Sequence, residues 1–181
     1  KGLQEDLFEE MKSRIKEDDE SVPYKKNGYF YISRYEIGGQ YPIHSRKKKS
    51  LDAPEEILFD VNELAKDLEY FNLKGISISP NNKIAAFGTD KVSRRQYTLQ
   101  FKNLETNEIL NDRIENTTGS ATWANDNKTV YYAKQDETTL RSDKIYKHIV
   151  GTDASKDVEV FFEKDDTFGT FVYKTKSEEY I

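Results

Sequence analysis

Ser77-Ile-Ser-Pro-Asn-Asn-Lys-Ile-Ala-Ala-Phe87 and Thr122-Trp-Ala-Asn-Asp-Asn-Lys-Thr-Val-Tyr-Tyr132 repeat one pattern at an offset of 45 residues. Each copy reads as a strand, a turn rich in Asn or Asp, and a second strand, and each is followed by a longer hairpin. A four-stranded unit that recurs about every 45 residues is the signature of a β-propeller blade. Because a blade cannot bury both of its faces alone, the chain is expected to form part of a ring.

The composition supports a folded β protein with a thin core and a highly charged surface. Of 181 residues, 13% are aromatic, with 12 Tyr and 10 Phe, and these residues suit pleated, half-buried surfaces. The net charge of −5 argues against a nucleic-acid binder, which needs a basic face. The absence of cysteine excludes disulfides and thiolate metal sites and fits a reducing compartment. No apolar run approaches the ~20 residues of a membrane span.

The expected fold is mostly β: a partial β-propeller preceded by an N-terminal amphipathic helix. Residues 1–22 would hold the helix and its connection, and residues 23–181 the partial propeller. About three four-stranded blades are predicted, at about 23–67, 70–112 and 121–163, with the start of a fourth at 167–181. Since the sequence stops inside what reads as the second strand of that fourth blade, a truncated domain is expected.

The helix is predicted over residues 3–17, where Leu3, Leu7, Met11 and Ile15 recur every four residues. Two interpretations of this stripe remain open. It belongs either to an ordinary helix packed on its own domain or to a segment that docks on a domain outside this chain.

The change to a period of two after Tyr24 predicts strands in the rest of the chain. Residues 61–65 are expected to form a short helical turn, and residues 111–122 to link two blades. The strands are expected at 29–34, 41–46, 57–59, 75–79, 83–89, 96–103, 108–110, 121–124, 129–134, 142–148, 157–163 and 167–173.

No constellation in the sequence indicates catalysis or metal binding. The stretch nearest to a nucleophile elbow is Gly75-Ile-Ser77-Ile-Ser79, which lacks the final glycine and reads as a plain strand. His44 and His148 lie in separate strands without metal-ligand spacing, so both are interpreted as structural or surface residues. The predicted catalytic, cofactor-binding and metal-binding residues are therefore none, and no cofactor is expected.

The charged clusters are interpreted as solvated turns or caps. These clusters are Arg46-Lys-Lys-Lys49 at a hairpin tip, Asp18-Asp-Glu20 and Asp165-Asp166. For Arg94-Arg95 two interpretations stay open: an exposed pair, or a buried or inter-domain ion pair, because guanidinium groups suit carboxylates.

Five separated motifs nevertheless carry a resemblance that covers essentially the whole chain. In order they are Asp18-Asp-Glu-Ser-Val-Pro-Tyr24, Leu51-Asp-Ala-Pro-Glu-Glu-Ile57, Ser93-Arg-Arg-Gln-Tyr97, Trp123-Ala-Asn-Asp126 and Glu163-Lys-Asp-Asp-Thr167. This series resembles the N-terminal part of the oligopeptidase B (protease II) group in the prolyl oligopeptidase family of serine peptidases.

The resemblance implies a propeller that caps the active site of an α/β-hydrolase domain and filters substrates by size. The full-length parent would be a serine endopeptidase that hydrolyses short peptides, after Lys or Arg. Its Ser, Asp and His triad would lie in a C-terminal domain that this chain lacks, so no catalytic residue carries over and the chain alone is expected to be inactive.

The partners implied are peptide substrates, bound through that C-terminal domain, with no nucleic acid and no membrane. Exposed blade faces would favour homo-oligomers. The expected location is the cytoplasm, with the periplasm left open because the chain begins at Lys1. The 45-residue repeat by itself also allows an alternative, a stand-alone propeller-type interaction module. An in-frame Gly-x-Ser-x-Gly several hundred residues beyond Ile181 favours the peptidase, whereas a stop codon soon after Ile181 favours the module.

Overall fold

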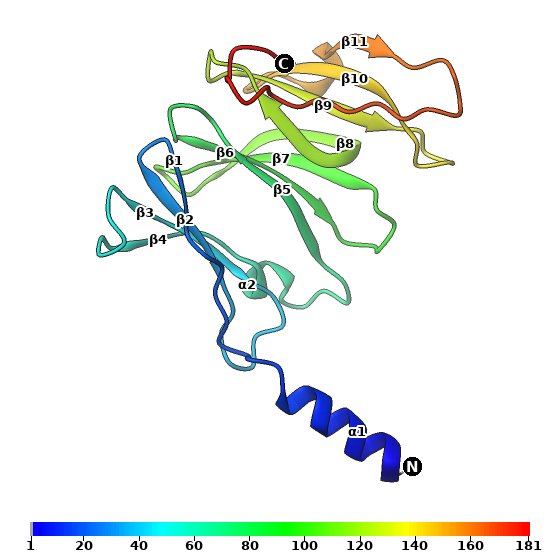
Figure 1. Ribbon diagram of the computed structural model, residues 1–181. Coiled ribbons are helices and arrows are strands. Elements are labelled where there is room, and N and C mark those ends of the chain that lie inside the picture. Colours follow the sequence, from blue (N-terminus) through cyan, green and yellow to red (C-terminus); the bar gives the residue numbers. More distant parts are fainter. Residues whose placement is uncertain (1) are drawn as a thin grey trace. The chain divides into compact units, whose positions relative to one another are not determined.

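The computed structural model describes residues 2–181 and contains two compact units (Figure 1). The first unit ends at Lys66, and the second spans Asp67–Ile181. Apart from two α-helices and one short 3₁₀ helix, the regular elements are antiparallel strands, which confirms the prediction of a mostly β fold with one N-terminal amphipathic helix.

Helix α1 (Gly2–Ser13) is shorter than predicted. Its last turn tightens, because the amides of Arg14 and Ile15 donate to the carbonyls three residues earlier, Met11 O at 3.2 Å and Lys12 O at 3.0 Å. No residue of the helix is buried, and the apolar stripe is exposed. The apolar stripe of α1 is therefore not buried against any other part of residues 2–181.

The first unit contains one four-stranded antiparallel meander. Its strands pair in sequence order, and Asp60, the last residue of the fourth strand, caps helix α2 (Val61–Ala65) by accepting from the Asn62 amide at 3.0 Å. The short helical turn predicted at 61–65 is confirmed. The strands are β1 (Tyr24–Lys26), β2 (Tyr29–Arg34), β3 (Ile43–Lys48) and β4 (Glu55–Asp60).

The second unit contains seven strands that also pair in sequence order. A 3₁₀ helix, η1 (Ala154–Lys156), precedes the last strand. The strands are β5 (Asn72–Ile78), β6 (Ile84–Asp90), β7 (Tyr97–Asn103), β8 (Ile109–Trp123), β9 (Thr129–Gln135), β10 (Ser142–Ile149) and β11 (Val158–Phe162).

Strand β8 belongs to two blades, because it bends sharply within its length (Figure 1). Its first half pairs with β7, for example Ile114 with Leu99, and its second half pairs with β9, for example Thr122 with Tyr131. The segment 111–122, expected as a connection between blades, is therefore part of a strand. Gly119, with φ +83°, permits the bend, since an L side chain rarely adopts that conformation.

Three glycines allow the backbones to approach closely at this bend. A Cβ atom at Gly88 would lie 2.4 Å from the Gly119 Cα, and one at Gly75 would lie 2.2 Å from the Gly119 carbonyl oxygen. Real Cβ atoms essentially never make such contacts. The absence of side chains at these positions thus lets β5 and β6 lie against the bend of β8.

Trp123 joins the first strands of two consecutive blades. Its side chain is buried, with 4% of its surface exposed, and its ring meets Phe101 edge-on at 6.1 Å. The indole N–H donates to the Ser77 carbonyl on β5 at 2.9 Å. Trp123 therefore lies in the core between these two blades.

Residues 167–181, predicted to begin a fourth blade, repeat the blade turn without forming a regular strand. The Thr175 amide donates to Tyr180 O at 2.9 Å, as Ser79 does to Ile84 O and Ala124 to Thr129 O in the two earlier turns. A strand needs a hydrogen-bonded ladder. The residues before this turn instead make isolated hydrogen bonds, such as that from the Thr122 hydroxyl to Val172 O at 3.0 Å.

Candidate functional site

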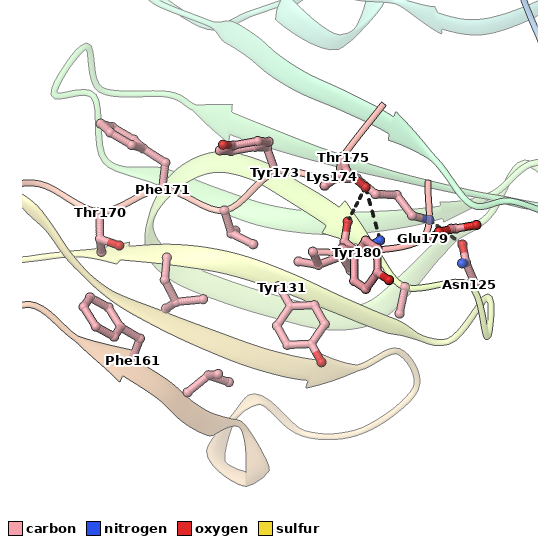
Figure 2. Close-up of a pocket in the computed structure, with 15 residues that line it drawn as sticks. Asn125, Tyr131, Phe161, Thr170, Phe171, Tyr173, Lys174, Thr175, Glu179 and Tyr180 are labelled. Atoms are coloured by element: carbon pink, nitrogen blue, oxygen red, sulfur yellow. Dashed lines mark hydrogen bonds between the residues drawn. The ribbon is translucent and has the colours of Figure 1, made fainter. Parts of the chain in front are cut away.

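An apolar groove of about 850 Å³ lies between the third blade and the C-terminal segment in the second unit (Figure 2). Tyr131 of β9 and Phe161 of β11 lie on one side of it in this view, and Phe171 and Tyr173 lie on the other. The remaining lining residues are Ala124, Asn125, Ile145, Val160, Thr170, Val172, Lys174, Thr175, Glu179, Tyr180 and Ile181.

Hydrogen bonds hold the C-terminal segment in place along this groove. Asn125 is the central tether: its side-chain amide donates to Glu178 O at 3.0 Å, and its side-chain oxygen accepts from the Lys174 ammonium. The Thr170 amide donates to Ser142 O at 2.7 Å. The segment is therefore ordered by polar contacts while its aromatic side chains stay exposed.

The groove is suited to binding another apolar surface. Phe171 and Tyr173 expose 78% and 75% of their surface, and Val160 and Phe161 expose about half. An exposed apolar patch of this kind marks an interaction surface. The side chains that line it include no histidine, cysteine or serine.

One serine–histidine pair does occur, in the first unit, and sequence reasoning missed it. Ser33 Oγ lies 2.8 Å from His44 Nδ1, because the two residues are directly opposite on β2 and β3. Burial lowers the pKa of His44. In a catalytic triad the serine contacts Nε2 while a carboxylate holds Nδ1. Here the serine occupies Nδ1, so the pair is a cross-strand hydrogen bond and not a triad.

His148, predicted from the sequence to be structural or exposed, is fully buried between two carboxylates. Its Nδ1 lies 2.6 Å from Asp157 Oδ1, and its Nε2 lies 3.0 Å from Asp112 Oδ1. The Phe101 ring stacks on the imidazole at 5.4 Å. Both ring nitrogens of His148 therefore face carboxylate oxygens. The cluster ties β7 and β8 to β10.

Tyr132 extends this cluster, since its hydroxyl donates to Asp157 Oδ2 at 2.8 Å. Burial, together with this bond to the carboxylate, raises the pKa of Tyr132. The Gly151 amide in turn donates to Asp112 at 2.6 Å. Each carboxylate therefore has a second donor, and the network is interpreted as a structural clamp.

The basic run Arg46–Lys49, expected to be a solvated hairpin tip, is exposed at Lys48 and Lys49 but buried at Arg46. Arg46 lies within β3 with 3% of its side chain exposed, packs over the Tyr29 ring at 4.2 Å and pairs with Glu56. Cross-strand pairing buries it, since its aliphatic stem and planar head both pack against the sheet.

The other charged clusters lie on the surface. Arg94 and Arg95 are exposed on the loop after β6, and the buried Asp90 shapes that loop by accepting from the Val92 and Arg95 amides at 2.9 and 2.8 Å. Asp165 caps its own turn by accepting from the Thr167 amide at 3.0 Å, as predicted. The third expected turn, Asp18–Glu20, is exposed.

Residues 2–181 contain no group of three or more His, Cys, Asp or Glu side chains placed to hold a metal ion. Neither of the α-helices in the described part of the chain is long and apolar enough to span a membrane.

Comparison with known proteins identifies the family. The profile of the prolyl oligopeptidase N-terminal β-propeller domain matches residues 1–181. The chain is 36% identical over 196 residues to dipeptidyl aminopeptidase BI of Pseudoxanthomonas mexicana, covering 100% of this chain and 27% of that protein. It is 32% identical over 184 residues to Protease 2 of Moraxella lacunata, covering 98% and 26%.

Solved structures agree with the sequence relatives. Oligopeptidase B from Leishmania major superposes with a TM-score of 0.89 at 30% identity, covering 96% of this chain and 25% of that one. Oligopeptidase B from Trypanosoma brucei with covalently bound antipain, in its closed form, gives 0.84 at 26% identity, covering 93% and 24%. The chain thus spans about a quarter of the length of these relatives. Because the family profile extends over the whole sequence, the chain belongs to the prolyl oligopeptidase family and is part of its N-terminal β-propeller domain.

Proposed function

We propose that this chain is the N-terminal part of the substrate-gating propeller of a serine endopeptidase that cleaves short peptides after Lys or Arg. The observation that carries the proposal is the match of all 181 residues to the propeller domain of a peptidase family. Protease 2 and oligopeptidase B are among the relatives matched over nearly the whole chain. Catalysis would be acyl transfer by a Ser–His–Asp triad in a further domain, with backbone amides holding the oxyanion.

The apolar groove supports a role for this chain as one section of a larger ring. In a propeller, each blade buries its faces against its neighbours. The exposed aromatic residues of the groove, with Phe171 and Tyr173 most prominent, would pack against a following blade. A closed ring would then surround a channel that admits flexible peptides and excludes folded proteins.

The alternative activity is that of a dipeptidyl aminopeptidase, because the relative at 36% identity has that name. An enzyme of that type would release dipeptides from a free N-terminus. The propeller would again restrict access, so the two activities differ in how the substrate is positioned and not in the reaction chemistry.

The test uses the full-length protein that contains this sequence, with the 181-residue chain as the control. Three fluorogenic peptides are compared: one N-terminally blocked with Arg before the scissile bond, the same peptide with Ala in place of Arg, and a dipeptide with a free amine. We expect the full-length protein to cleave the blocked Arg peptide fastest and the 181-residue chain to cleave none.

Two other outcomes would change the conclusion. Cleavage confined to the free-amine dipeptide would support the aminopeptidase, because a blocked N-terminus prevents that mode of binding. If the reading frame ends soon after Ile181 and the product hydrolyses no peptide, a stand-alone interaction module replaces the peptidase.

A further inference from the structure

The turns that follow the first strand of each blade form a continuous row in the second unit. The row, here called the turn row, consists of residues 79–84, 124–129 and 175–180, and each turn closes with the same backbone hydrogen bond. The three bonds join Ser79 N to Ile84 O at 2.8 Å, Ala124 N to Thr129 O at 2.9 Å, and Thr175 N to Tyr180 O at 2.9 Å.

Asparagine side chains connect each turn to the next. Asn127 Oδ1 in the second turn accepts from the Asn81 amide in the first at 2.7 Å. The Asn125 side-chain amide in the second turn donates to Glu178 O in the third at 3.0 Å. These bonds span 46 and 53 residues of sequence, so they join neighbouring blades and not neighbouring residues.

The backbone conformation places Asn127 for this contact. Asn127 has φ 63°, in the left-handed region, which asparagine tolerates better than most side chains do. The carboxamide of Asn127 is not needed to close its own turn, because Asp126 already accepts from the Lys128 and Thr129 amides at 3.0 and 2.8 Å. The side chain of Asn127 is free to reach the first turn.

The turn row lies beside the first strands of the blades, and these strands contact one another directly. The Trp123 indole bonds Ser77 O, and the Thr122 hydroxyl bonds Val172 O. Because the blades of a propeller radiate from a central channel, the strands through which consecutive blades meet most closely lie at the inner margin. The turn row would then border one end of the channel.

We propose that Asn125 and Asn127 lock the turn row into a fixed rim and so limit the size of peptide that passes this end of the channel. This inference rests on the proposed function, in which the propeller restricts access to the active site. It assigns that restriction to two positioning residues whose hydrogen bonds hold adjacent turns at a set spacing. Neither residue takes part in bond cleavage.

The test compares N127G with N107G in the full-length protein. Glycine keeps the left-handed conformation available and removes only the carboxamide. Asn107 is a matched control, because it has φ 64° in the exposed turn between β7 and β8, outside the turn row. For each protein, kcat/KM is measured on a two-residue fluorogenic substrate and on an unstructured peptide of about 30 residues, the size range where a rim would matter.

We expect N127G to raise the ratio of long-peptide to short-peptide kcat/KM by about fivefold, the factor that corresponds to one hydrogen bond. N107G should leave the ratio unchanged. As a second readout, hydrogen exchange of the Asn81 amide should accelerate by a similar factor in N127G alone, since that amide loses its acceptor. A purely structural role would lower stability without shifting the ratio.

The outcomes distinguish the hydrogen bond between the turns from its effect on peptide access. Unchanged exchange at Asn81 would overturn the rim lock itself. Faster exchange with an unchanged ratio would overturn the role in access. A wild-type protein that cleaves neither peptide would overturn the proposed function and with it the access role, while the exchange result would still decide whether the rim exists.

Discussion

Replacing Trp123 with alanine tests how consecutive blades pack against each other, because Trp123 lies in the core between them. The indole is 4% exposed, contacts Phe101 edge-on, and bridges β8 to β5 through its bond to Ser77 O. The substitution therefore removes a large buried side chain and the donor of a hydrogen bond between blades in one step.

The expected loss of stability can be built from these contacts. Truncating a buried aromatic side chain to alanine costs about 3–5 kcal/mol, and losing the indole donor costs about 1 kcal/mol more. In a chain of this length each kcal/mol lowers the melting temperature by about 2–4 °C, so Trp123→Ala should lower it by about 10–20 °C. Trp123→Phe, which keeps most of the apolar volume, should cost only about 1–2 kcal/mol.

Thermal unfolding followed by circular dichroism measures the effect, with Phe171→Ala as the control. Phe171 is aromatic but 78% exposed, so its removal should change stability by no more than about 0.5 kcal/mol. If Trp123→Ala shifts the midpoint by only a degree or two, the indole does not carry the contact between blades and the reasoning is refuted.

Four further predictions concern packing, charge and association. Gly88→Ala should destabilise the chain by about 1–3 kcal/mol in urea unfolding, because its Cβ would collide with the Gly119 backbone; wild-type stability would contradict the close approach. His148→Ala should cost about 2–6 kcal/mol by the same assay, since each of two buried carboxyl groups loses a hydrogen-bond partner, and a cost below ~1 kcal/mol would show that water replaces the imidazole. The hydrogen bond from Arg34 lowers the pKa of Glu55 in the folded protein. The stability that this pair contributes is therefore present above the unfolded pKa of about 4.3 and is lost as the pH falls through the lower folded value. Glu55→Gln should remove this part of the acid sensitivity, and equal stability–pH profiles for the two proteins would count against the pair. The 181-residue chain should self-associate through its exposed blade face in sedimentation, and a single 21.1 kDa species at high concentration would contradict that expectation.

Much of the fold could be predicted from the sequence because the repeat carries the blade period. The 45-residue offset between the Ser77 and Thr122 segments indicated two consecutive blades, and strands β5, β6 and β9 lie close to the ranges expected from it. Local signals also sufficed for α2, where Asp60 is a good cap for a short helix.

What the sequence did not reveal depends on tertiary contact. Arg46 reads as part of an exposed basic run until pairing with β4 brings Glu56 beside it. Residues 111–122 were expected only to link two blades, yet ladders with β7 and β9 make the segment part of a strand on both sides of Gly119. The contacts of His148 with Asp112 and Asp157 span 36 and 9 residues and follow no local pattern.

For the apolar groove, the sequence predicted that blade faces would be exposed but not where the groove would lie. Exposed blade faces follow from the number of predicted strands, but the path of residues 170–181 depends on single bonds such as that from Asn125 to Glu178 O. Sequence periodicity cannot show bonds of this type, because each joins an irregular segment to a turn.

The central claim is that this chain serves a serine peptidase whose reacting groups lie outside residues 1–181. The most direct measurement treats the full-length protein with a serine-directed phosphonate and locates the modified residue by peptide mass spectrometry. The account predicts one labelled serine beyond Ile181, with loss of Arg-peptide hydrolysis in proportion to labelling. A label on a serine within this chain, or continued hydrolysis by the fully labelled protein, would contradict it.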